Sequence, residues 1–195
     1  METKWVVSGA AFATLCVRRD LATALCIFGA IVNALLAKLC KRLFNASRPD
    51  GAGLSDPGMP SSHAQSLFFF ATYLSMMLDE PALSSVLRGN AYTFILSRLL
   101  PVAFFGAAAV LASLRVRAGL HTIAQVGVGA CFGSAFGAGW VAAQPRLVRF
   151  VGERLHDVSS GALVALLIVG ALVVGSVERQ IAKQLKNAAS QKKRK

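Results

Sequence analysis

The chain alternates long uncharged, apolar stretches with short polar connections. Five stretches contain no Lys, Arg, Asp or Glu, namely residues 21–37, 57–78, 99–114, 118–145 and 158–177. Most of them provide the roughly 20 residues that a membrane-spanning helix needs. The pattern therefore predicts an all-α protein, a polytopic membrane bundle of five to six transmembrane helices.

The sixth candidate helix is short. Residues 5–17 are thirteen uncharged residues, a length shared by buried, re-entrant and signal-peptide segments. Lys4 in front of this stretch and the small residues inside it allow a signal peptide. The stretch lies very close to Met1 for a cleavage site, which favours a short first helix.

The composition also indicates a membrane protein. Of the 195 residues, 55% are hydrophobic and 15% are charged, and the mean hydropathy is +0.57, far above that of a soluble domain of this size. The net charge of +12 allows a nucleic-acid partner, but the basic residues lie in the connections and in a tail at residues 179–195. We therefore expect membrane phospholipids, and no nucleic acid, as the anionic neighbours.

Cysteine and glycine have structural interpretations. The cysteines, Cys16, Cys26, Cys40 and Cys131, form no CxxC pair, so we expect small buried hydrophobic side chains and neither disulfides nor metal ligands. Gly129, Gly133 and Gly137 recur every four residues. They share one helical face, which predicts close approach of a neighbouring backbone.

Eight polar residues lie beside or within the apolar stretches: Lys41, Arg48, Ser61, Ser62, His63, Arg115, His121 and Gln125. Polar and ionisable groups in a membrane bundle are costly, so they are candidates for function. Three of the eight are cations and none is an acid; the nearest acids, Asp50 and Asp56, lie in the glycine- and proline-rich loop. Such a pocket suits a polyanion, and phosphate is the obvious one.

The two histidines each have a local context. His121 and Gln125 are four residues apart at the head of an apolar helix, so the amide oxygen can accept an imidazole N–H and leave the other ring nitrogen free as a base or nucleophile. The segment "PSSHAQ" is typical of a helix start, where hydroxyls and free N–H groups bind anions, with His63 in the first turn. The pair indicates a nucleophile and a general acid on either side of a phosphate; the alternative is two histidines at the membrane interface.

Together these segments resemble the type 2 phosphatidic acid phosphatase and haloperoxidase superfamily. Its first motif, lysine, six residues and Arg-Pro, is matched by Lys41 and Arg48 with Pro49. Its second, Pro-Ser-Gly-His, is matched by "PSSH" at residues 60–63. Its third is matched by Arg115, five residues and His121, but Leu114 and Gln125 stand where the family has serine and aspartate. The span, residues 41–125, is under half the chain.

The resemblance is greatest to the plant and algal lipid phosphate phosphatase epsilon group and to dolichyl diphosphatases, which also have "GMPSSH" and a glutamine after "HT". It implies a metal-independent integral-membrane enzyme without cofactor that hydrolyses phosphatidate to diacylglycerol and phosphate through a phosphohistidine. The alternatives are a dolichyl or polyprenyl diphosphate phosphatase and a catalytically impaired relative. The substrate would be a phospholipid or polyprenyl phosphate in the bilayer.

The resemblance also implies a role for each matched residue. His121 attacks phosphorus and His63 protonates the departing lipid oxygen. The phosphate is held by Lys41, Arg48, Ser61, Ser62 and Arg115, and Gln125 orients the nucleophile. A soluble haloperoxidase does not fit so apolar a chain, and a transporter would not need these residues at these spacings.

We expect one transmembrane lipid phosphatase domain at residues 1–178, with its motifs in a core at residues 38–145, and a basic tail at residues 179–195. If every stretch crosses once, both active-site segments and the tail share one face, which the positive-inside rule puts toward the cytosol or stroma. The expected location is an organelle membrane, of the endoplasmic reticulum or the chloroplast envelope. The ending "KKRK" resembles a retrieval signal for the endoplasmic reticulum, and no transit-peptide pattern precedes Trp5.

Overall fold

The computed structural model describes residues 21–78 and 91–154. The chain divides into two compact units, one formed by Met1–Ala24 with Gly152–Lys195 and the other by Leu25–Val151. Nearly all described residues belong to the second unit, and its architecture is given below. The expected domain boundary at residue 178 lies outside the described residues and stays a prediction.

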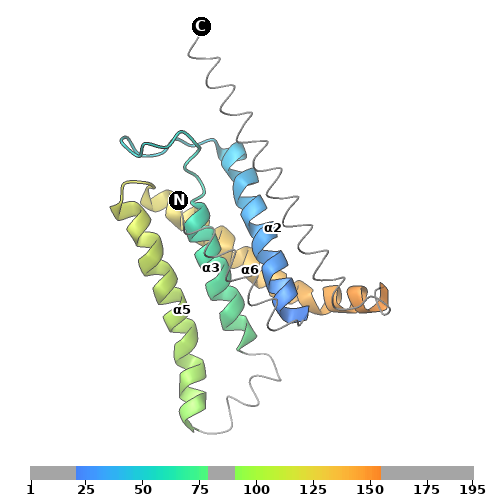
Figure 1. Ribbon diagram of the computed structural model, residues 1–195. Coiled ribbons are helices and arrows are strands. Elements are labelled where there is room, and N and C mark those ends of the chain that lie inside the picture. Colours follow the sequence, from blue (N-terminus) through green and yellow to red (C-terminus); the bar gives the residue numbers. More distant parts are fainter. Residues whose placement is uncertain (1–20, 79–90, 155–195) are drawn as a thin grey trace. The chain divides into compact units, whose positions relative to one another are not determined.

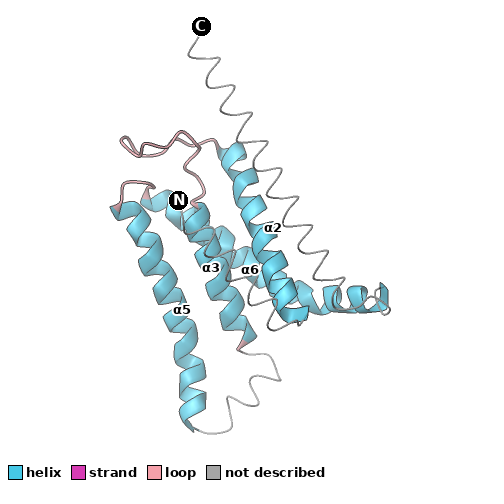
Figure 2. Ribbon diagram, viewed as in Figure 1, coloured by secondary structure: helices cyan, strands magenta, loops and turns pink. Residues whose placement is uncertain are grey.

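The described residues form four α-helices and no strand: α2 (Leu21–Phe44), α3 (Ser62–Met77), α5 (Ala91–Arg117) and α6 (Ile123–Arg154) (Figures 1 and 2). Each overlaps one of the predicted apolar stretches but differs from it in its bounds. The other two predicted helices, at residues 5–17 and 158–177, lie outside the described residues, so the expected total of five to six is not confirmed.

Three of these helices are long and apolar enough to cross a membrane, over Thr23–Phe44, Ala91–Arg117 and Ile123–Arg149. The prediction that residues 57–78 form a spanning helix needs correction, because α3 begins only at Ser62 and has 16 residues. At 1.5 Å per residue it is about 24 Å long, shorter than the ~30 Å hydrocarbon core. Pro57, Gly58 and Pro60 keep the preceding chain out of a helix.

Two helices continue into the polar connections. α2 runs on to Phe44, so Lys41 lies in its last turn and not in a loop, and Arg115 lies in the last turn of α5. Cations at these positions are favourable because the C-terminal end of a helix carries partial negative charge. The chain then leaves α2 through Asn45, with φ of 41°, and leaves α5 through Gly119, with φ of 66°; this left-handed conformation is typical of the residue that follows a helix.

Helix α3 contacts each of the other three helices. On one side the amide nitrogen of Gln65 donates to the Asn33 carbonyl of α2 at 3.1 Å. Phe68 packs on Phe105 of α5, with ring centroids 6.0 Å apart. Phe69, which is fully buried, packs on Phe136 of α6 at 5.9 Å.

The close helix approach predicted from the glycine repeat is confirmed. A Cβ atom on Gly129 would lie 2.6 Å from the Ser61 carbonyl oxygen, and one on Gly137 would lie 3.0 Å from that of Phe69. At Gly133 a Cβ would overlap the carbonyl of Gln65. The α6 glycine face therefore lies against the backbone of α3, which fixes the start of α3 beside the start of α6.

The cysteines of the described residues are free thiols that differ in exposure. Cys40 is buried, as expected, whereas Cys26 is partly exposed and Cys131 is exposed. The expectation of a buried Cys131 is therefore wrong, because Cys131 is two residues from Gly129 and from Gly133 and so lies on the side of α6 opposite the packed glycine face. Cys16 lies outside the described residues.

Candidate active site

The connection between α2 and α3 and the turn between α5 and α6 meet at one end of these helices (Figure 1). The Ser61 backbone N–H donates to the Gln125 carbonyl at 3.0 Å, which ties the start of α3 to the start of α6. The three matched motifs are thereby assembled from helix ends and from the chain between them. Residues distant in the sequence become neighbours at this end.

His121 lies in the α5–α6 turn and is 4% exposed. Its Nδ1 atom is 3.0 Å from the Gly58 carbonyl oxygen and 3.2 Å from Oε1 of Gln125. Its Nε2 atom is 3.1 Å from Nη1 of Arg48. Carbonyl oxygens can only accept and a guanidinium can only donate, so Nδ1 carries the proton and Nε2 has the lone pair.

Gln125 has its orientation set by a second contact. Its Nε2 atom donates to the Ser47 carbonyl at 2.7 Å, which leaves Oε1 for His121. The Thr122 backbone N–H also donates to Oε1 at 3.1 Å, and the Gln125 N–H donates to the Thr122 hydroxyl at 3.2 Å. This reciprocal pair is a capping box at the start of α6. Our sequence interpretation missed it, although the spacing Thr-x-x-Gln signals it.

Gly58 is a further site residue that the sequence analysis did not select. Its carbonyl accepts from His121, and a Cβ on it would lie 2.6 Å from Nε2 of Gln125. No side chain fits there unless the amide moves. This close approach explains the glycine, but only the fold brings it beside Gln125.

The guanidinium of Arg48 is the centre of the hydrogen-bond network. Nη1 donates to the Leu120 carbonyl at 2.9 Å and contacts His121. Nε donates to the Asp56 carbonyl at 3.0 Å, and Nη2 contacts both carboxylate oxygens of Asp56 at 2.9 Å. The Arg48 side chain is only 7% exposed. Its contact with His121 brings the cation of the first motif against the histidine of the third.

Asp56 lies between two of the predicted phosphate-binding cations. Its carboxylate accepts from Lys41 Nζ at 2.6 Å as well as from Arg48. Burial opposes its ionisation, but the hydrogen bonds and charges of Lys41 and Arg48 outweigh burial and lower the pKa of Asp56 below 3.8. The predicted site does not include Asp56, and the structure shows this carboxylate in contact with two of the predicted cations.

The remaining predicted residues border the same end. Ser61 is fully buried at the position before α3, and its hydroxyl makes no cap hydrogen bond. Ser62 begins α3, and His63 follows it. Desolvation, first, and then the positive charges of Arg115 and Lys41 lower the pKa of His63 below 6.5. Five buried side-chain atoms of the described residues have no hydrogen-bond partner, and two of them, the Ser61 hydroxyl and Nε of Arg115, belong to predicted site residues. Such unpaired groups are costly and suit a site that receives a polar ligand.

The charge around His121 affects its protonation. Burial, first, and then the positive charge of Arg48 and of Lys41 lower the pKa of His121 below 6.5, while its hydrogen bonds to Gln125 and Gly58 act in the opposite direction. The imidazole is therefore neutral at neutral pH, and its Nε2 lone pair is available for chemistry.

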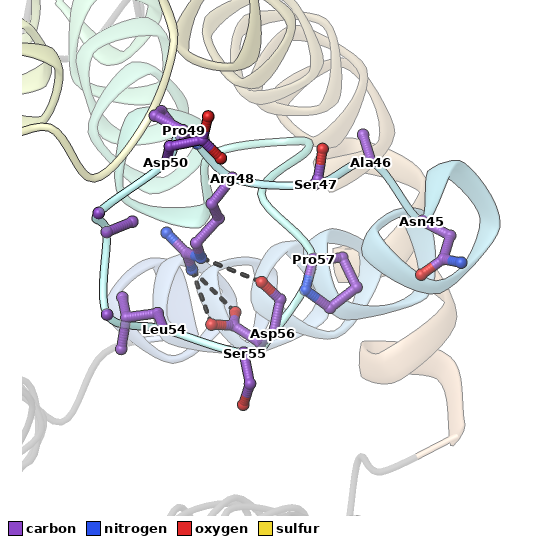
Figure 3. Close-up of a pocket in the computed structure, with 13 residues that line it drawn as sticks. Asn45, Ala46, Ser47, Arg48, Pro49, Asp50, Leu54, Ser55, Asp56 and Pro57 are labelled. Carbon is purple, nitrogen blue, oxygen red and sulfur yellow. Dashed lines mark hydrogen bonds and ion pairs between the residues drawn. The ribbon is translucent and has the colours of Figure 1, made fainter.

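An open hollow of about 620 Å³ lies within the α2–α3 connection, lined by residues 45–57 (Figure 3). In Figure 3 the Arg48 side chain points toward Asp56 across this hollow, and the dashed lines mark their contacts. The hollow therefore meets the His121 network through Arg48. Among the described residues no cluster of three His, Cys, Asp or Glu side chains is placed to hold a metal ion.

Comparison with known proteins gives a consistent set of similarities. A family model described as the PAP2 superfamily matches residues 19–149. Lipid phosphate phosphatase epsilon 1, chloroplastic, of Arabidopsis thaliana is 36% identical over 147 residues, which cover 75% of this chain and 50% of that protein. Lipid phosphate phosphatase epsilon 2, chloroplastic, of the same plant is 32% identical over 173 residues, 89% of this chain and 56% of that protein.

A third relative, lipid phosphate phosphatase gamma of Arabidopsis thaliana, is 33% identical over 129 residues, 63% of this chain and 54% of that protein. The chain spans about half the length of the curated relatives it matches. No solved structure matches it.

Proposed function

The chain belongs to the PAP2 superfamily, and on that premise we propose that it is an integral-membrane lipid phosphate phosphatase that converts phosphatidate to diacylglycerol and phosphate. The names of the relatives support a lipid phosphate as substrate. Three apolar helices long enough to span a bilayer support a substrate that enters from the membrane.

One observation carries the proposal: Nε2 of His121 has an unprotonated lone pair beside the guanidinium of Arg48. A nucleophile and a cation that binds phosphate oxygens together support in-line attack on a phosphate monoester, and this pair supplies both. When substrate binds, a phosphate oxygen takes the Nη1 hydrogen bond of Arg48, which releases the Nε2 lone pair for attack.

The proposed reaction has two steps. Bound phosphate offsets the charges of Arg115 and Lys41 and so favours protonated His63. In the first step, Nε2 of His121 forms a bond to phosphorus, the bond between phosphorus and the lipid oxygen breaks, and His63 gives its proton to that oxygen. In the second, His63 takes a proton from water, the water oxygen bonds to phosphorus, and the phosphorus–nitrogen bond breaks to release phosphate. Lys41, Arg48 and Arg115 stabilise the charge on the phosphoryl oxygens without a metal ion, and Ser61 and Ser62 donate hydrogen bonds to them.

Gln125 replaces the aspartate of the family motif in this mechanism. The neutral oxygens of Gln125 and Gly58 both accept from Nδ1 of His121, so they hold the tautomer and ring without adding negative charge. They stabilise the positively charged phosphohistidine ring less than a carboxylate would. The nucleophile here is therefore the weaker base.

The competing functions are a dolichyl or polyprenyl diphosphate phosphatase and a catalytically impaired relative. We place the protein in an organelle membrane; two relatives named chloroplastic support the chloroplast envelope, and the endoplasmic reticulum is the alternative.

The test is phosphate release by the purified full chain in detergent micelles with EDTA present, from phosphatidate and from a polyprenyl diphosphate. We expect release from phosphatidate in EDTA and a loss of about 10³-fold or more in His121→Ala. His156→Ala, a histidine outside all three motifs, should match the wild type. Full activity of His121→Ala would refute the mechanism, and loss of all activity on chelation would refute its metal independence.

A further inference from the structure

Asp56 makes more contacts with the proposed phosphate-binding cations than any other described residue. Its carboxylate accepts from Lys41, both of its oxygens lie 2.9 Å from Nη2 of Arg48, and its backbone carbonyl accepts from Nε of Arg48. The Gly58 N–H donates to the Ala46 carbonyl at 2.7 Å and closes the loop that carries Asp56. The loop therefore holds this carboxylate in place against both cations.

Most of the Arg48 donors are engaged in this arrangement. A guanidinium offers five N–H groups; Nε and Nη1 contact Asp56, Leu120 and His121, and Nη2 contacts both oxygens of the Asp56 carboxylate, which leaves at most one N–H free. A phosphate that binds more than one N–H group of Arg48 must share or replace some of these contacts, and Asp56 receives three of them. The carboxylate therefore acts directly on the same donors as the ligand.

Asp56 also changes the charge that a ligand meets. Lys41, Arg48 and Arg115 bring three positive charges, and ionised Asp56 removes one of them, which leaves two. A fully ionised phosphate monoester carries two negative charges, whereas a diphosphate monoester carries a third. The Asp56 side chain is half exposed, so a larger anionic group can approach it.

We propose that Asp56 is a specificity-determining residue of this site: its carboxylate, held between Lys41 and Arg48, balances one cation and so favours phosphate monoesters over diphosphates. This inference rests on the proposed phosphatase function and deepens it by naming the substrate class. Two positive charges match a dianion, while the carboxylate repels the additional charge of a diphosphate.

The test compares Asp56→Asn, which removes the charge and keeps the shape, with the matched control Asp50→Asn. Asp50 lies in the same loop and is exposed, so its change alters the net charge equally. We expect Asp56→Asn to raise kcat/KM for farnesyl diphosphate relative to a short-chain phosphatidate by about tenfold, the effect of one charge several ångströms away in a partly hydrated site. Asp50→Asn should keep the wild-type ratio.

A binding measurement separates this inference from the proposed function. Dissociation constants of inorganic phosphate and of pyrophosphate are measured by calorimetry on the same purified proteins. Asp56→Asn should tighten pyrophosphate by about tenfold relative to phosphate. If the wild type hydrolyses neither lipid, the proposed function fails, while the ratio of these two constants still decides the role of Asp56.

Two further variants test charge against shape. Asp56→Glu keeps the charge and should keep the wild-type ratios, and Asp56→Gln is a second neutral variant that should behave like Asp56→Asn. Unchanged ratios in the neutral variants would overturn the proposal. Shifts of equal size in Asp56→Glu would also overturn it, because that variant keeps the charge. If both neutral variants fail to fold while Asp56→Glu folds, Asp56 is a structural residue and the proposal is likewise overturned.

Discussion

His121 Nδ1 lies 3.0 Å from the carbonyl oxygen of Gly58. This contact, between the third motif and the chain just before the second, favours the tautomer with the proton on Nδ1, whichever side chain stands at position 125. Since Gln125 adds a second acceptor at 3.2 Å, the ring has two neutral oxygens where the family pattern has a carboxylate. The first prediction follows from the two acceptors that Nδ1 of His121 has.

Gln125→Ala should reduce phosphate release by roughly fivefold to tenfold, the equivalent of one net hydrogen bond of about 1 kcal/mol. The Gly58 carbonyl remains to accept from Nδ1, so the loss should be far smaller than that of His121→Ala. The measurement is kcat for phosphatidate in detergent micelles.

Thr122→Ala is the matched control for Gln125→Ala. It removes the threonine half of the capping box and should cost about 1 kcal/mol of stability, while Nδ1 of His121 keeps both acceptors. Its effect on kcat should therefore be smaller than that of Gln125→Ala. Equal losses in kcat would show that Gln125 acts through the helix start and not through His121.

The second prediction concerns the protonation of His121. Burial and the charges of Arg48 and Lys41 lower its pKa below 6.5, so Arg48→Gln should raise this pKa by removing the first of these charges. The contribution of this histidine to stability is present above about pH 6.5 and is lost as the pH falls through the lower folded-state pKa.

NMR titration of the histidine ring resonances measures this shift, with His121→Asn used to assign the signal. Asp50→Asn should leave the titration of His121 unchanged, because Asp50 is exposed and is not among the groups that shift the pKa of His121. A His121 pKa that stays the same or falls in Arg48→Gln would contradict the electrostatic assignment.

The third prediction concerns the contact of α6 with α3. Gly133→Ala would place a Cβ against the Gln65 carbonyl, and overpacking of this kind costs about 1–3 kcal/mol. We expect a lower melting temperature in detergent and reduced phosphate release, because the same packing aligns the starts of both helices.

Gly139→Ala is the control in the same helix, since a Cβ at that position meets nothing within 4 Å. It should be neutral or stabilising, by up to about 1 kcal/mol, because alanine has the higher helix propensity. Equal destabilisation by the two changes would mean that the glycine face is not the tight interface described above.

The helices were largely predictable because their signal is local. Apolar stretches at residues 21–37 and 99–114 predict α2 and α5, since uncharged runs of this length favour helices in a membrane. The glycine repeat predicts close packing because its four-residue spacing, which puts the glycines on one helical face, is also a local signal. α3 was predicted too long, because a count of uncharged residues does not register that Pro57, Gly58 and Pro60 stop the helix at Ser62.

The amino-acid sequence by itself determined which side chains are available at this site: two histidines, three cations and a glutamine at motif spacing. Only the tertiary structure decided that Asp56 lies between Lys41 and Arg48 and that the carbonyls of Gly58 and Ser47 orient His121 and Gln125. Every residue has a backbone carbonyl, so residue type does not reveal which one faces an imidazole 63 positions away. That choice comes from packing of α3 on α6, which brings the two connections together and sets the charge and the tautomer of the site.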